Sequence, residues 1–217
     1  MIIKSLLFSV VLALGLSSAI VAEELKVKIS RNLPSVDIMH KGKKITIQRN
    51  QNNKNTVDPR FAMTSRNCPP FCINPIVVAP GVETLGEIEL LGYLKKMSEG
   101  DDSILVIDSR TPSWVKSGTI PGAKNIPWTK LNVGRGADPL SIADLVTSEF
   151  NAKELDDDTF DFSKARTLIL FCNGMWCGQS PTNIHSLLKM GYPANKIKWY
   201  RGGMQNWSNL GLTTVAD

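Results

Sequence analysis

The sequence predicts an α/β fold: a parallel sheet with helices on both faces, preceded by a small β-rich N-terminal piece. Short apolar runs alternate with helical apolar stripes from Glu83 onward, which is typical of parallel sheets covered on both faces. Before residue 61 the apolar residues instead recur with a period of two, as in strands. The chain has 217 residues, 42% hydrophobic and 21% charged, enough for one core plus an accessory piece.

The first 22 residues have the pattern of a signal peptide. Lys4 supplies a short positive region, Leu6–Leu16 is apolar, and small residues allow cleavage near Ala19 or Ala22. An uncleaved anchor is the alternative, because the apolar stretch approaches the shortest length that spans a bilayer. Glu23 just beyond it favours cleavage. We therefore expect an exported, periplasmic protein with no stable membrane insertion after cleavage.

Residues 23–60 are expected to form the small β-rich segment. Apolar and polar residues alternate along Leu25–Ile29, which indicates a strand. The runs Val36–Ile38 and Ile45–Ile47 flank a turn at His40–Lys43, and together they predict a β-hairpin.

Residues 61–82 are expected to form a proline-rich connector that contains Cys68 and Cys72. Export permits disulfides, and we predict a structural disulfide between these two cysteines. A metal site is the alternative, because the C-x3-C spacing resembles spacings used for copper. It would recruit other side chains, namely Met63, His40 and His185. Since the sequence has no paired Cys/His cluster, no metal is expected.

Residues 83–217 are expected to form the main α/β domain. Helices are predicted at 83–97, 141–150, 181–190 and 202–210, and strands at 104–107, 167–171 and 198–200. In such sheets ligands lie beyond the carboxyl ends of the strands. Cys172 occupies that position, directly after the apolar strand 167–171.

Cys172 begins a glycine-containing loop that leads to a predicted helix. The loop consists of Asn173, Gly174, Met175, Trp176, Cys177, Gly178, Gln179 and Ser180. Ser180 is expected to cap this helix, with Pro181 at its first position. Backbone N–H groups and the helix dipole then favour the thiolate of Cys172, which is the nucleophilic form. A buried structural cysteine is the alternative interpretation.

Two further segments carry a family resemblance. Residues 104–128, ILVIDSRTPSWVKSGTIPGAKNIPW, resemble the front signature of the rhodanese family, and residues 199–207, WYRGGMQNW, resemble its C-terminal signature. The family's reactive cysteine lies between them, where Cys172 falls. The resemblance implies a rhodanese-like domain over residues 83–217. It also places Asp108 and Arg110 near the loop, where they can orient it, although a scaffold pair is the simpler interpretation.

The loop departs from the family pattern. Seven residues separate Cys172 from Ser180, and none of them is a cation. Family loops often include an arginine, which would pair with an oxyanion such as thiosulfate. Trp114 and Thr119 replace a glutamate and a histidine of the family, and we interpret both as scaffold changes. The sequence therefore lowers the expectation for thiosulfate as the donor.

The leading prediction is a periplasmic sulfurtransferase that carries sulfane sulfur as a persulfide on Cys172, stabilised by loop N–H groups from Gly174 to Gly178. No cofactor is expected, and the partners are a small sulfur donor or an acceptor thiol protein. The alternatives are a thiol–disulfide redox protein that uses Cys172 and Cys177, and a non-catalytic binding module. Trp176 is expected either to shield the thiol or to dock a partner. His185 can serve as a base, but a half-buried surface residue is the simpler interpretation.

Charge excludes one class of partner. The net charge is +5, with a basic excess in Lys26–Arg66 and an acidic stretch at Asp138–Asp161. No Lys/Arg stripe is interleaved with aromatic residues, and no nucleic-acid-binding module is recognisable. We interpret these charges as solvated surface and expect no nucleic-acid partner.

Overall fold

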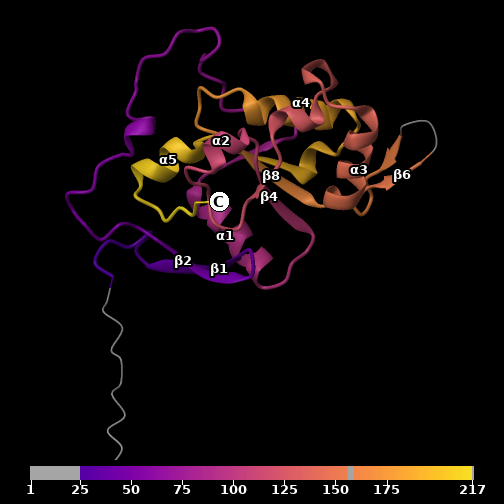
Figure 1. Ribbon diagram of the computed structural model, residues 1–217. Coiled ribbons are helices and arrows are strands. Elements are labelled where there is room, and N and C mark those ends of the chain that lie inside the picture. Colours follow the sequence, from indigo (N-terminus) through magenta and orange to yellow (C-terminus); the bar gives the residue numbers. More distant parts are fainter. Residues whose placement is uncertain (1–24, 156–158, 217) are drawn as a thin grey trace, which may run out of the picture.

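The computed structural model describes residues 25–155 and 159–216 (Figure 1). The predicted signal peptide and the acidic residues Asp156, Asp157 and Asp158 lie outside the described residues. Within the described ranges, every helix is too short or too polar to cross a membrane.

The centre of the molecule is a five-stranded parallel sheet with the order β3-β9-β8-β4-β5. Its strands are β3 (Glu83–Leu85), β9 (Ile197–Tyr200), β8 (Thr167–Phe171), β4 (Ile104–Asp108) and β5 (Lys124–Asn125). β4 and β8 are almost continuously apolar, because both faces of the inner strands are covered. The predicted α/β fold class is confirmed.

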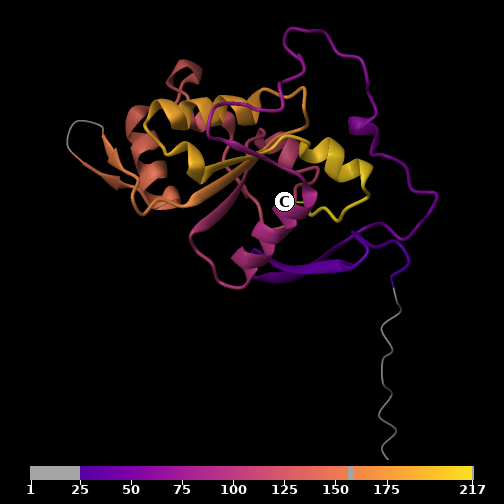
Figure 2. The same ribbon diagram turned by 180° about the vertical axis from the view of Figure 1, so that it is seen from behind.

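The helices divide between the two faces of the sheet (Figures 1 and 2). They are α1 (Glu87–Ser98), α2 (Pro112–Val115), α3 (Pro139–Phe150), α4 (Gln179–Lys189) and α5 (Gly203–Asn209). Successive residues of β8 alternate between two cores: Leu168 and Leu170 belong to the core with α3 and α4, whereas Ile169 and Phe171 belong to the core with α1 and α5. Shorter elements complete the fold: the hairpin β6 (Lys153–Glu154) and β7 (Phe160–Asp161), and the 3-10 turns η1 (Pro59–Phe61), η2 (Trp128–Leu131), η3 (Val133–Arg135) and η4 (Ala194–Lys196).

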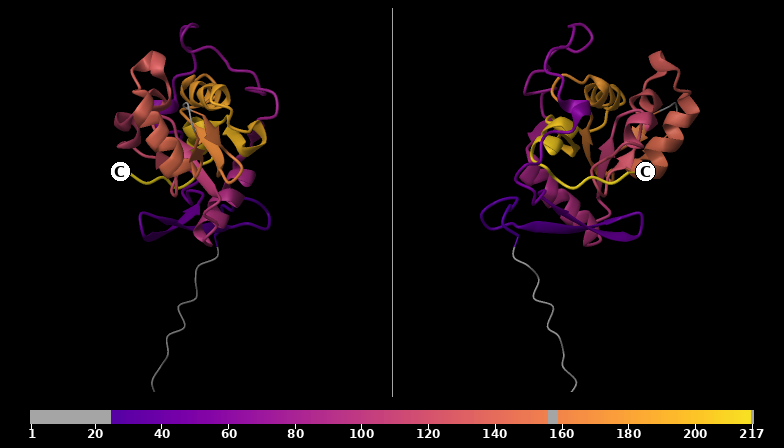
Figure 3. Two further views of the ribbon diagram at one scale, coloured as in Figure 1. Left: turned by 90° about the vertical axis from the view of Figure 1, so that its right-hand side faces the viewer. Right: turned by 60° about the vertical axis from the view of Figure 1, so that its left-hand side comes forward.

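The N-terminal hairpin of β1 (Ser35–His40) and β2 (Lys43–Gln48) lies along α1 (Figure 3). Ile38 and Ile47 are buried in the same core as Leu91 and Leu94 of α1. Lys41 and Gly42 both have positive φ, as the tight turn between right-twisted strands requires. The predicted hairpin is confirmed, and it shares a core with the main domain.

Two local predictions are wrong. Leu25–Ile29 forms no strand, because the Gln51 side chain occupies its backbone hydrogen-bonding groups. The Val27 N–H donates to Gln51 Oε1 at 3.1 Å, and Gln51 Nε2 donates to the Val27 carbonyl at 2.9 Å. Residues Glu83–Leu85 are not the start of a helix, because they pair with β9 at the edge of the sheet. α1 begins only after Gly86, where Glu89 caps the free backbone N–H.

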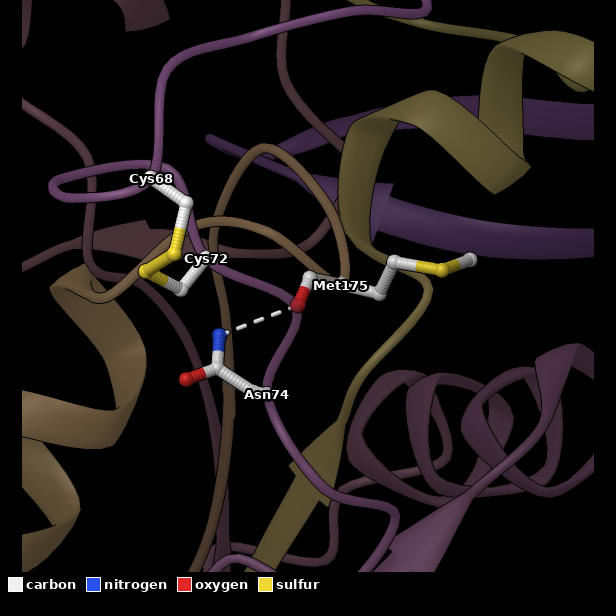
Figure 4. The surroundings of a disulfide bond; sticks show 4 residues. All are labelled: Cys68, Cys72, Asn74 and Met175. Atoms are coloured by element: carbon white, nitrogen blue, oxygen red, sulfur yellow. Dashed lines mark hydrogen bonds between the residues drawn. A yellow bond between two sulfur atoms is a disulfide. The ribbon is translucent and has the colours of Figure 1, made fainter.

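Most of the connector from residue 61 to 82 is irregular chain that runs past α5 toward the loop after β8 (Figure 2). Cys68 and Cys72 are joined by a disulfide, with their Cα atoms 4.6 Å apart. The closed ring lies beside the loop that carries Cys172, and the connector continues directly along that loop (Figure 4).

Candidate active site

The Cys172 loop is held by the start of α5. The N–H groups of Met204 and Gln205 donate to the carbonyls of Cys172 and Asn173 at 3.0 and 2.9 Å. The backbone can approach this closely because residue 203 is glycine, with φ of 55°, and an added Cβ would collide with the Cys172 carbonyl and the Gly174 N–H. Gly203 therefore positions the loop.

Cys172 is 2% exposed and is surrounded by donors. Burial raises the pKa of its thiol. Hydrogen bonds from the Cys177 side chain, the Ser180 hydroxyl and the N–H groups of Ser180 and Gly174 outweigh burial and lower the pKa to about 7. The Ser180 Oγ lies 3.2 Å from the sulfur. These hydrogen bonds therefore favour the thiolate of Cys172.

The pKa of Cys177 is shifted in the opposite direction to that of Cys172. Burial, together with the neighbouring Cys172 sulfur, raises its pKa well above the ordinary value. Both cysteines are free and buried. The Cys172 Sγ lies 3.3 Å from the Cys177 carbonyl oxygen, and the Cys177 Sγ lies 3.8 Å from Gln179 Oε1. Because the pKa of Cys172 is lowered and that of Cys177 is raised, the negative charge is located on Cys172.

Ser180 does not cap α4, contrary to the prediction. The helix begins at Gln179, its N-cap is Gly178, and no side chain caps it. The Ser180 hydroxyl is instead directed to Cys172 and also accepts from Trp199 Nε1 at 3.1 Å. The serine of the predicted cap is therefore part of the thiolate site.

Removing this hydroxyl should be visible in the pH dependence of Cys172. The wild-type alkylation rate is expected to rise with pH through about 7 and then to level off, because the thiolate is the reactive form. In Ser180→Ala the midpoint is expected to move upward by about one to two pH units, since a hydrogen bond to a charged group is worth about 1.5–3 kcal/mol. The measurement is the rate of iodoacetamide addition to Cys172, followed by mass spectrometry.

Trp199→Phe is the matched control for Ser180→Ala. It removes the indole N–H that donates to Ser180 Oγ but keeps the bond from Ser180 to the sulfur. Its stability should fall while its midpoint stays near that of the wild type. A Ser180→Ala midpoint equal to the wild-type value would show that the hydroxyl does not stabilise the thiolate.

The connector is hydrogen-bonded to the Cys172 loop through Asn74. Its side-chain amide donates to the Met175 carbonyl at 3.0 Å (Figure 4). Its backbone N–H donates to the same carbonyl at 2.9 Å, and the amide also donates to the Cys177 carbonyl at 3.1 Å. Arg201 in turn donates to the Asn74 carbonyl at 2.7 Å. Asn74 and Arg201 are site residues that sequence reasoning missed, because nothing in the pattern of the connector indicates which residue meets the loop.

The tertiary structure also brings a cation to the loop. Arg66 of the connector stacks on the ring of Trp176, with its guanidinium carbon 4.1 Å from the ring centroid. Trp176 is buried, donates from Nε1 to Gln205 at 2.7 Å and packs edge-on against Phe71. It thus helps to cover the two thiols. The loop itself contains no cation, but Arg66 of the connector brings a positive charge to the site.

A cavity of about 440 Å³ opens beside the loop. Cys177 and Asn173 line it, whereas Cys172 is not among its lining residues. Trp114 also lines the cavity, and it packs against the core, with its ring stacked on Phe61 at 6.2 Å between centroids. Thr119 does belong to the scaffold, since its hydroxyl donates to Asp108 at 2.6 Å.

Asp108 and Arg110 form a buried ion pair with Nη2 and Oδ2 2.6 Å apart. Arg110 also donates to the Gly118 carbonyl at 2.7 Å, which ties the end of β4 to the following turn. Ser109, between them, donates its N–H to the Phe171 carbonyl at 2.9 Å. The pair therefore shapes the strand end beside the loop, and it hydrogen-bonds to Gly118 and Thr119 of the scaffold.

The remaining candidates lie elsewhere. His185 is exposed, and its Nδ1 is 2.8 Å from the Pro181 carbonyl of its own helix. His40 accepts from the Gly122 N–H at 3.0 Å, in the hairpin region. Among the residues that the structure describes, no group of three His, Cys, Asp or Glu side chains is placed to hold a metal.

The fold and the site define a cysteine-centred α/β domain, with a stabilised thiolate after the central strand. A family model described as the rhodanese-like domain matches residues 90–210, which is more than half of the chain. The chain belongs to this family.

Comparison with solved structures finds rhodanese and sulfurtransferase domains. The BH2092 protein of Bacillus halodurans is 19% identical, with a TM-score of 0.42, and the match covers 63% of this chain and 77% of that one. The human single-domain sulfurtransferase TSTD1 is 21% identical, with a TM-score of 0.35 and coverage of 59% and 96%. SseA of Escherichia coli, titled a 3-mercaptopyruvate sulfotransferase, is 17% identical, with a TM-score of 0.39 and coverage of 58% and 43%. No curated protein matches significantly.

Proposed function

We propose that this protein is an exported sulfurtransferase that carries sulfane sulfur as a persulfide on Cys172. The observation that supports this most directly is the environment of the Cys172 sulfur. It accepts hydrogen bonds from a hydroxyl, two backbone N–H groups and the Cys177 thiol, and these lower its pKa to about 7. A buried structural cysteine needs no such set of donors.

The same donors serve both states of the reaction. The Cys172 thiolate attacks the outer sulfur of the donor, a new S–S bond forms, and the bond to the leaving group breaks with its electron pair on that group. From thiosulfate the leaving group is sulfite. The resulting persulfide anion is stabilised by the hydrogen-bond donors around the sulfur. An acceptor thiolate then takes the outer sulfur and regenerates Cys172, so this chemistry needs no cofactor.

Export is part of the proposal. It is supported by the signal-peptide pattern of the first 22 residues. The disulfide in the connector is a second support, because such bonds persist mainly in oxidising compartments.

The hydrogen bond between the two free thiols favours a thiol–disulfide redox protein as the second candidate function. Cys177, once deprotonated, can attack the inner sulfur of the Cys172 persulfide. A Cys172–Cys177 disulfide then forms and hydrosulfide leaves with the electron pair of the broken S–S bond.

Intact mass measurement separates the candidates. Incubation with a sulfane-sulfur donor is expected to add the mass of one sulfur atom at Cys172 and none in Cys172→Ser. In Cys177→Ser the added sulfur should persist longer, because no neighbouring thiol can displace it. A loss of two hydrogens at Cys172 and Cys177, without any sulfur-bearing species, would support the redox protein. A Cys172 that stays reduced and unmodified with every donor would support the binding module.

A further inference from the structure

The disulfide between Cys68 and Cys72 is accessible to solvent. Cys68 is exposed and Cys72 is half-buried, so a thiol in solution can reach the bond. Exposed disulfides are the ones that exchange readily with thiols. The two cysteines are only four positions apart, and a bond that closes so short a ring removes little entropy from the unfolded chain. The main effect of this disulfide is therefore local.

Three contacts hold the connector against the Cys172 loop, and all three come from residues within the disulfide ring or two positions from it. Arg66, before the ring, stacks on Trp176 with its guanidinium carbon 4.1 Å from the ring centroid. Phe71, inside the ring, packs edge-on against the same tryptophan, with 5.7 Å between centroids. Asn74, after the ring, donates its side-chain amide to the Met175 carbonyl at 3.0 Å (Figure 4). The disulfide thus fixes how these three groups are spaced against the loop.

A second cavity, of about 430 Å³, adjoins the disulfide. Both cysteines of the bond line it, together with the exposed apolar side chains of Met63 and Ile73. Arg66 and Trp176 line it as well, and both also line the cavity that contains Cys177. A positive charge beside a disulfide favours the thiolates that exchange produces. The cavity therefore gives an incoming thiol access to the bond next to a cation.

Cys172 is closed off in this oxidised form of the protein. Its residue is 2% exposed, and it lines neither of the two cavities. A reactant therefore reaches the sulfur only after the loop has moved. α5 binds the start of the loop through the carbonyls of Cys172 and Asn173, whereas the connector binds the carbonyls of Met175 and Cys177 farther along. Release of the connector frees this second part of the loop and leaves the strand end in place.

We propose that the Cys68–Cys72 disulfide is a second thiol-reactive site, and that its reduction by a dithiol opens the Cys172 loop. The first thiolate attacks the Cys68 sulfur, a mixed disulfide forms, and the Cys68–Cys72 bond breaks with its electron pair on Cys72. The second thiolate attacks the reductant's own sulfur in the mixed disulfide, and Cys68 leaves with that electron pair. The reductant becomes an internal disulfide, and its two protons pass to Cys68 and Cys72.

A dithiol is the fitting reductant because its second attack is intramolecular and therefore fast. The opening of the loop does not depend on what Cys172 carries. As a control of sulfur transfer, however, the inference rests on the proposed function.

The first test is reduction of the folded protein by dithiothreitol. Cys68 and Cys72 are expected to become available to N-ethylmaleimide, as located by peptide mass mapping, while the near-UV circular dichroism of the core aromatic residues is retained. Labelling of these two cysteines only in urea that unfolds the protein would show a purely structural bond and would overturn the proposal.

The second test is the rate of iodoacetamide addition to Cys172 at about pH 9, above its pKa of about 7. Reduced and desalted wild type should react at least about fivefold faster than the oxidised protein, the lower end of coupling between linked sites. Cys68→Ser/Cys72→Ser should react at the fast rate without any reductant. If this variant fails to fold, the reduced wild type carries the test. Equal rates in the oxidised and reduced wild type would overturn the proposal.

Asn74→Ala tests whether the connector transmits the effect. Linkage is reciprocal, so a contact that the disulfide favours also favours the disulfide. Oxidised Asn74→Ala should therefore be reduced at a lower dithiothreitol concentration, and its Cys172 should react at nearly the same fast rate in both forms. A difference between the two forms as large as in the wild type would contradict this route of opening.

Asn67→Ala is the matched control. Asn67 is an exposed asparagine of the same connector, and within the part of the chain that the structure describes only its backbone carbonyl is hydrogen-bonded, to the Phe71 N–H. It should keep the wild-type dithiothreitol dependence and the wild-type difference in Cys172 reactivity. Loss of that difference in Asn67→Ala would mean that the contacts of Asn74 are not what holds the loop.

Persulfide loading separates this inference from the proposed function. If the alkylation rate of Cys172 depends on the disulfide while no sulfane-sulfur donor loads Cys172, the sulfur-transfer function fails and the control of access stands. If donors load Cys172 at equal rates in the oxidised wild type and in Cys68→Ser/Cys72→Ser, and the alkylation rates are also equal, the control of access fails alone.

Discussion

Gly203→Ala is expected to lower the free energy of unfolding by about 2–5 kcal/mol, combining about 1–2 kcal/mol of left-handed backbone strain with about 1–3 kcal/mol of overpacking. The new methyl group would collide with the Cys172 carbonyl and the Gly174 N–H, which define the loop. Sulfur loading of the folded fraction should fall by roughly 100-fold, because a displacement of about 1 Å in a reacting group has this effect. Urea unfolding and persulfide mass measurement test the two parts.

Gly42→Ala is the matched control. Gly42 also has a positive φ, of 76°, but no heavy atom lies within 4 Å of an added Cβ. It should therefore show the backbone strain alone, about 1–2 kcal/mol, with unchanged sulfur loading. If both variants lost the same stability and neither lost loading, close approach of α5 would not be what positions the loop.

Arg110→Met is expected to lower the free energy of unfolding by about 3–5 kcal/mol, because it leaves the buried Asp108 carboxylate without its ionic partner. Both side chains are essentially buried, at 0% and 1% exposure. The arginine donates from Nε and Nη2 to the two carboxylate oxygens at 2.6–3.1 Å. Urea unfolding of the purified variant measures the loss.

The chain contains its own control for this experiment. Asp58 and Arg60 repeat the same Asp-x-Arg arrangement with the same bidentate geometry, but their side chains are 30% and 36% exposed. Arg60→Met should cost at most about 1 kcal/mol, since water replaces the lost partner. Similar losses in the two variants would mean that burial does not decide the contribution of the pair.

The order of the elements and the reactive position follow from local patterns. The strand Thr167–Phe171, whose last four residues are apolar, is β8 as predicted, and Cys172 follows it. The turn at Lys41 and Gly42 is also local, because its residue types determine which φ values are accessible. Such features depend on side-chain period and backbone sterics over a few residues. For this reason the sequence alone predicts the parallel sheet, the hairpin and the cysteine at the strand end.

The chemistry of the site depends on contacts between segments that are distant in sequence. Ser180 was expected to cap a helix, but its hydroxyl bonds the Cys172 sulfur because the loop folds back onto the strand end. Arg66 supplies the cation that the loop lacks, from more than 100 residues earlier in the chain. Hydrogen bonds and stacking act over a few ångströms, so their partners are decided by how the connector and α5 pack. The sequence by itself determined where the thiol lies, and only the tertiary structure decided which groups lower its pKa and surround its cavity.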